Sequence, residues 1–113
     1  MTCAIGRSGT RAGKREGDGA TPEGRWKMEY LLYRSDKIRR PVAPFLVSGI
    51  ALGDGWCDSP DDRNYNRKVQ HPYAASAERL WRDDDLYDLI VVLDHNQRPR
   101  TRNGGSAVFL HVA

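Results

Sequence analysis

The run Leu89-Ile90-Val91-Val92-Leu93 is the most apolar part of the chain and sets its fold class. It ends at Asp94-His95-Asn96, residue types that favour turns. A short, uninterrupted run rich in β-branched residues and closed by a turn indicates a strand covered on both faces. We therefore expect a buried strand over residues 87–94.

Three further segments on either side have strand patterns. In the segment 25–34, apolar and polar residues alternate and predict a half-buried strand; one face carries Trp26, Met28, Tyr30 and Leu32. The segment 45–52 predicts another strand after Pro41 and Pro44. Residues 106–112 predict a last strand after the turn Asn103-Gly104-Gly105.

The remaining segments are polar or carry helix signals. Residues 53–70 are turn-rich and predict a long loop, and the first two dozen residues are Gly-rich without an apolar face. Residues 75–84 predict one short helix, with Ser76 as the N-cap. The expected fold is thus mostly β with one short helix, in a single domain spanning residues 1–113.

Composition limits the classes of protein that this chain can represent. It has 113 residues, of which 39% are hydrophobic, and a mean hydropathy of −0.69, so its core must be modest. No stretch approaches the ~20 apolar residues that cross a bilayer, which argues against a membrane-spanning protein. Residues 1–14 contain no apolar segment typical of a signal peptide. Two cysteines are too few for a disulfide scaffold or a Cys-rich zinc site.

The charge is segregated along the chain. The net charge of +3 combines a basic segment 1–40, with ten Lys/Arg against five Asp/Glu, and an acidic segment 41–96, with five against ten. Arg98, Arg100 and Arg102 follow. A nucleic-acid-binding protein gathers its basic residues without an acidic block of equal size beside them, so we expect no nucleic-acid partner.

Motifs for cofactors and metals fail on spacing. The segment Gly9–Lys14 lacks the glycine spacing and the Ser/Thr of a phosphate-binding loop. Asp62, Asn64 and Asn66 imitate a calcium loop, but its required glycine and glutamate positions hold Arg67 and Tyr73. The histidines and Cys57 show no zinc-ligand spacing. We expect neither a cofactor nor a metal.

Two residues are candidates for chemistry, each with a structural alternative. Cys57 lies in a polar loop and has the side chain of a nucleophile, but Asp54 and Asp58 flank it and oppose thiolate formation, which favours a packing role beside Trp56. His111 ends a strand and shares a face with Ala107 and Phe109, opposite Leu110. Its position suits a catalytic base delivered by a strand, but spacing alone favours a hydrogen-bonded structural histidine.

Two segments resemble a known family. The loop Lys14-Arg15-Glu16-Gly17-Asp18-Gly19-Ala20-Thr21-Pro22-Glu23-Gly24 is similar to the K-x-E-G-D-x-x-T-P-x-G loop of the YkuD-like L,D-transpeptidase catalytic domain. The segment Gly105–His111 resembles the strand of that family that ends on its catalytic histidine. Between them, Asp54–Asp58, Asp62–Arg67 and Ala77–Trp81 are similar to the branch labelled ErfK/YbiS/YcfS/YnhG.

The resemblance implies an L,D-transpeptidase-like β-sandwich and a cysteine acyl-transferase that acts on peptidoglycan stem peptides in the cell envelope or periplasm. His111 matches the catalytic histidine of the family. The nucleophile of the family lies in a Gly-Cys motif after this histidine, and neither Cys3 nor Cys57 matches that motif. We therefore expect an incomplete domain, truncated before its nucleophile and inactive alone. The alternative is a non-catalytic fragment that binds wall peptides or has no stable fold.

Overall fold

The computed structural model describes residues 3–112, and these form three small β-sheets without a helix. Strands β3 (Met28–Tyr33), β4 (Val47–Gly49), β8 (Leu89–Leu93) and β9 (Phe109–His111) form a four-stranded sheet in the order β4-β3-β8-β9. The strands β5 (Asp54–Cys57), β6 (Lys68–Gln70) and β7 (Ala77–Arg79) form a three-stranded sheet in the order β6-β5-β7. Near the N-terminus, β1 (Thr10–Arg11) pairs with β2 (Thr21–Pro22). The mostly-β fold class is confirmed.

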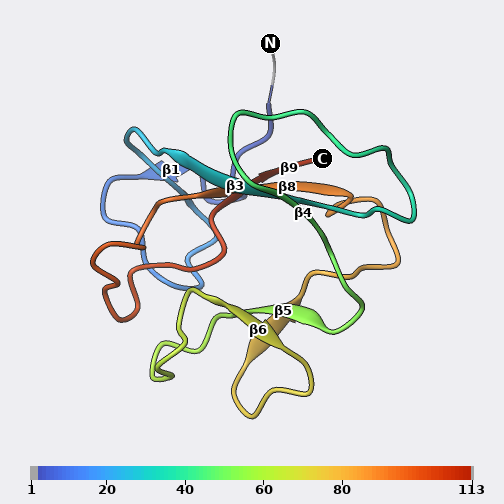
Figure 1. Cartoon of the computed structure of the whole chain (residues 1–113). Helices are drawn as coiled ribbons and strands as arrows, with labels where there is room; N and C mark the ends of the chain where they lie inside the picture. Colours follow the sequence, from blue (N-terminus) through green and yellow to red (C-terminus); the bar gives the residue numbers. More distant parts are fainter. Residues whose placement is uncertain (1–2, 113) are drawn as a thin grey trace.

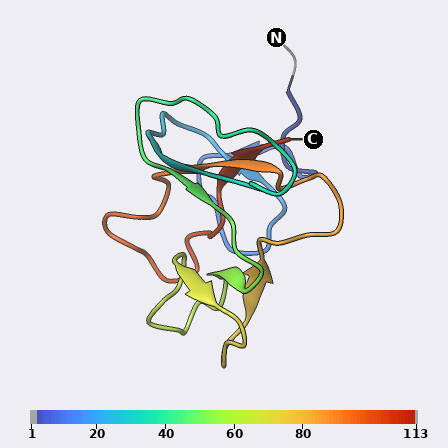
Figure 2. The ribbon, with the colours of Figure 1, turned by 45° about the vertical axis from the view of Figure 1, so that its right-hand side comes forward.

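The two larger sheets lie as separate layers, with the main core between them (Figures 1 and 2). This core consists of Leu32, Ile50, Trp56, Leu80, Tyr87, Ile90 and Val92. Trp56 of β5 meets Phe109 of β9 edge-on at 5.0 Å between ring centres, which joins the layers directly. Such edge-to-face pairs favour one relative position of the rings, so they help to fix the two sheets against each other.

The central strands β3 and β8 are covered on both faces. Their other face packs in a second cluster formed by Leu31, Tyr33, Val47 and Val91. The segment between β3 and β4 supplies Ile38 and Phe45 to this cluster, and it arches over the four-stranded sheet in Figure 1. The prediction of a buried strand at residues 87–94 is confirmed. For β3, however, the sequence indicated only one covered face.

Two sequence-based predictions about local structure are wrong. Residues 75–84 form no helix; Ala77–Arg79 instead pair with β5, because Gly55 and Trp56 lie opposite Arg79 and Glu78 in an antiparallel ladder. Residues 53–70 are not a plain loop, since they contain β5 and β6. In both places long-range strand pairing overrides local propensity. No helix among residues 3–112 could cross a membrane.

Candidate functional site

His111 is the last residue of β9 and lies opposite Ile90 of β8. The rings of Phe109 and His111 both meet the ring of Tyr87 edge-on, at 5.9 Å and 5.3 Å between centres. Leu110, on the opposite face of the strand, is 50% exposed. The alternation expected from the sequence is therefore present: His111 shares its face with the aromatic side chains of the core but is itself exposed to solvent.

The hydrogen bond of His111 determines the tautomer of its imidazole ring. Nδ1 lies 2.6 Å from the carbonyl oxygen of Val112. A carbonyl oxygen can only accept, so in the neutral imidazole the proton of this bond belongs to Nδ1. Nε2 then keeps its lone pair, and this exposed imidazole is able to take a proton from a neighbouring group.

A half-buried carboxylate lies beside Tyr87, the aromatic side chain that contacts His111. The hydroxyl of Tyr87 donates a hydrogen bond to Glu78 of β7, and the Arg82 guanidinium lies 5.3 Å from the Tyr87 ring centre. Burial raises the pKa of Glu78, while the Tyr87 hydrogen bond and the charges of Arg82 and His111 act in the opposite direction. Sequence patterns do not indicate this pair, because Glu78 falls in the segment that predicts a helix and Tyr87 begins an apolar strand.

The segment that leads into β9 is tied to the N-terminal loop by one carboxylate. The hydroxyls of Tyr65 and Ser106 both donate to Oε1 of Glu16, at 2.7 Å and 2.6 Å. The Tyr65 oxygen also accepts from the amide of Gly105 at 2.9 Å. Burial and the neighbouring Glu16 carboxylate raise the pKa of Tyr65, so the hydroxyl stays protonated and keeps donating.

A second anchor comes from Asn66, which is 1% exposed. Its Oδ1 accepts from the indole of Trp56 at 2.9 Å and from the amide of Ala107 at 3.2 Å. Its Nδ2 donates to the carbonyl groups of His95 and Asn96. One buried side-chain amide thus makes four hydrogen bonds. Through them Asn66 holds the residue Ala107, which precedes β9, against Trp56 of the three-stranded sheet and against the turn after β8.

The side chain of Cys57 lies on the face of β5 that points away from the core between the two sheets. Trp56 points into the core, so the next side chain along β5 lies on the opposite face of the strand. The Cys57 thiol is completely buried and lies 3.5 Å from a carboxylate oxygen of Asp62. Burial raises the pKa of the thiol, and Asp62 and Asp58 add to the increase. The structure does not bring Cys57 to His111.

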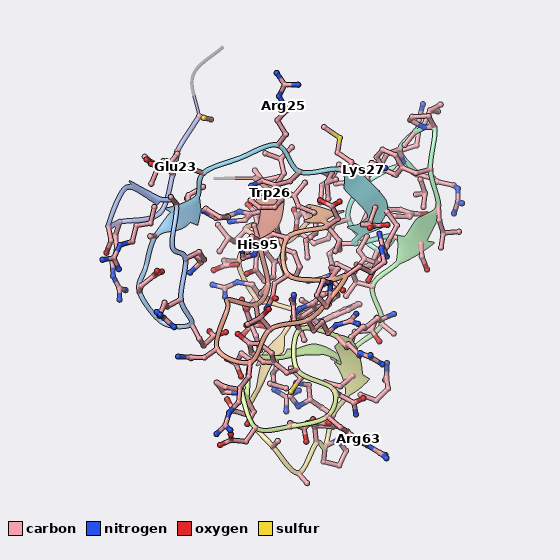
Figure 3. All side chains as sticks on the ribbon, turned by 90° about the vertical axis from the view of Figure 1, so that its left-hand side faces the viewer. Glu23, Arg25, Trp26, Lys27, Arg63 and His95 are labelled. Carbon is pink, nitrogen blue, oxygen red and sulfur yellow. The ribbon has the colours of Figure 1, made fainter. Side chains whose placement is uncertain are left out.

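A second histidine, His95, packs beside a tryptophan. His95 is 8% exposed, and its ring meets that of Trp26 edge-on at 4.8 Å (Figure 3). Burial, aided by the positive charge of Lys14, lowers the pKa of His95. Within residues 3–112, no three His, Cys, Asp or Glu side chains are grouped so that they could hold a metal ion.

The fold and the site together describe a two-layered β domain with an exposed histidine at the end of a strand. The model of the YkuD L,D-transpeptidase catalytic domain matches residues 1–113, so the chain belongs to this family of acyl-transferases. No curated protein and no solved structure matches the chain. The resemblance carried by the Lys14–Gly24 loop and the histidine strand is thereby confirmed at the level of the family.

Proposed function

We propose that residues 1–113 form part of the catalytic domain of a peptidoglycan L,D-transpeptidase, a cysteine acyl-transferase that acts on cell-wall stem peptides in the cell envelope. His111 is its general base. The observation that supports this role is the hydrogen bond from Nδ1 to the Val112 carbonyl, which leaves Nε2 with a lone pair at an exposed strand end.

The proposed reaction runs in two steps. His111 takes the proton of a cysteine thiol, and the thiolate attacks the carbonyl carbon of a stem-peptide amide, forming a thioester. The amide C–N bond breaks, and the departing amine takes the proton that His111 holds. An acceptor amine, or water in the related hydrolysis, then attacks the thioester and releases the thiol.

We assign the nucleophile to neither cysteine of this chain. Cys57 is buried beside two carboxylates, a setting that disfavours a thiolate. Cys3 is exposed, but it does not match the Gly-Cys motif of the family. The proposal therefore requires a thiol supplied from outside residues 1–113.

The decisive experiment uses a protein that includes both this chain and a following Gly-Cys motif. His111→Ala should lower its rate of acylation by about 100- to 10,000-fold, the usual contribution of a general base. Cys57→Ala is the matched control and should retain most of the rate, with melting curves showing that both variants fold. An inactive Cys57→Ala beside a nearly normal His111→Ala would place the site elsewhere.

A second experiment tests the assignment of the thiol on the 113-residue chain itself. Incubation with a carbapenem or a stem tetrapeptide should give no stoichiometric mass adduct. An adduct mapped to Cys57 would contradict the assignment.

A further inference from the structure

A small cavity lies at one end of the space between the two larger sheets. Its volume is about 210 Å³, and its apolar wall consists of Tyr30 of β3, Trp56 of β5 and Val92 of β8. The segment after β8, on the left of Figure 1, closes one side with Gln97. Sites that hold a whole small molecule usually measure about 300–1,000 Å³. This cavity is smaller and therefore has room for only one terminal group of a ligand.

Four cationic side chains surround this cavity, but only two of them have a carboxylate partner. They are Arg67, Lys68, Arg98 and Arg100. Arg98 pairs with Glu29, the one acidic residue of the lining, and Lys68 lies 3.3 Å from Asp54. Within residues 3–112, neither Arg67 nor Arg100 forms an ion pair.

The hydrogen bonds of Arg100 go to neutral oxygens. Its Nη2 donates to Oε1 of Gln97 at 2.5 Å, and its Nε lies 3.5 Å from the carbonyl oxygen of Asn66. Arg67 and Arg100 are both exposed residues, but partial desolvation of the Arg100 guanidinium lowers its pKa, and the nearby charges of Arg67 and Arg98 lower it further. The fold thus holds like charges together around a partly enclosed space, an arrangement that an anion would stabilise.

We propose that this cavity binds the oxyanion group of a small ligand, a carboxylate or a phosphate, through Arg67 and Arg100. A guanidinium presents paired N–H donors that match two oxygens of either group, and both side chains still have donors available. The indole of Trp56 and the ring of Tyr30 supply an apolar wall for the part of the ligand next to the anion. His111 is not among the residues that line this cavity, and the proposed anion site does not depend on the acyl-transfer proposal.

The three tryptophans give a site-specific readout. Trp56 lines the cavity, whereas Trp26 and Trp81 do not. We would titrate the ¹⁵N-labelled 113-residue chain at low ionic strength with citrate, and separately with inorganic phosphate, and follow the three indole N–H signals. A saturable shift confined to the Trp56 signal is expected. Saturation by citrate alone identifies a carboxylate site, and saturation by phosphate alone identifies a phosphate site.

Charge-matched variants separate binding in the cavity from general attraction to a basic chain. Arg100→Gln should raise the dissociation constant about tenfold or more, because it removes a charge-assisted hydrogen bond. Arg25→Gln removes the same charge at a position that extends into solvent away from the body of the molecule (Figure 3), and screening should limit its effect to less than about twofold. No saturable shift with either anion, equal shifts of all three indoles, the same shift with chloride, or equal effects of the two variants would overturn the proposal.

Discussion

Replacing Tyr65 with phenylalanine tests the anchor beneath the histidine strand. The Tyr65 hydroxyl is the only group that joins the amide of Gly105 to the carboxylate of Glu16 in the described part of the chain. Tyr65 is 4% exposed, so water cannot easily take the place of the lost oxygen. The ring fits the same space in Tyr65→Phe, and the change therefore removes hydrogen bonds without creating a large cavity.

The two lost bonds set the expected loss of stability. A buried amide left without an acceptor costs about 1–3 kcal/mol, and a hydrogen bond to a charged group contributes about 1.5–3 kcal/mol. Glu16 keeps its bond from Ser106, so the second contribution falls near its lower limit. We expect Tyr65→Phe to lower the free energy of unfolding by about 3 kcal/mol, a large part of the ~5–15 kcal/mol that holds a typical domain together.

Urea unfolding followed by tryptophan fluorescence measures this loss. With a slope of about 1–3 kcal/mol per molar urea, the midpoint should fall by roughly 1–3 M at an unchanged slope. Tyr33→Phe is the matched control: Tyr33 is 7% exposed, but its hydroxyl has no hydrogen-bond partner among residues 3–112. That control should change the free energy of unfolding by less than about 0.5 kcal/mol. Equal effects of the two variants, or a loss below about 1 kcal/mol for Tyr65→Phe, would refute the reasoning.

Three further predictions follow from buried or paired groups. Asn66→Ala removes four hydrogen bonds of a side chain that is 1% exposed, and should lower the free energy of unfolding by about 3–5 kcal/mol in the same urea assay; a loss below about 1 kcal/mol would contradict the anchoring role. A side-chain hydrogen bond from Lys14 and hydrogen bonds from two backbone amides hold the pKa of Asp18 well below its usual range. The ionised Asp18 carboxylate therefore stabilises the fold fully above about pH 4, and this stabilisation is lost as the pH falls toward the lowered pKa. Asp18→Asn should therefore unfold more readily than the wild type near neutral pH, and the difference should shrink in acid; a difference that grows in acid would contradict this sign. A thiol reagent should modify the exposed Cys3 rapidly and reach the buried Cys57 only on unfolding, and prompt modification of both in the native chain would show that β5 is open.

Local pattern was enough to predict the central layer of the fold. β3, β8 and β9 each lie within a predicted strand. Their alternating or continuous apolar pattern depends only on residues that are neighbours in the sequence, so it can be recognised without the structure. The same alternation placed His111 on the face of Phe109, and the pairing of β9 with β8 supports that placement. The acidic neighbours of Cys57 correctly indicated a raised thiol pKa, although burial is its main cause and the contributing carboxylates are Asp62 and Asp58 rather than Asp54.

Local pattern could not predict the second sheet. Asp54-Gly55-Trp56-Cys57 has an acidic residue and a glycine in a four-residue strand, a composition typical of a turn. It forms a strand because β6 and β7 pair on either side and Trp56 is buried against Phe109. The carboxylate of Asp54 is accommodated by Gln70 and Lys68, which follow it by more than a dozen residues.

The sequence by itself thus determined the fold class, the central strands and the face on which His111 lies, since each depends on neighbouring residues. Only the tertiary structure decided what holds that histidine strand in place. Glu16 and Ser106 are 90 residues apart, and Asn66 and Ala107 are 41 apart. Buried polar groups must find partners wherever the fold brings them, and no local pattern records which distant oxygen a given amide will meet.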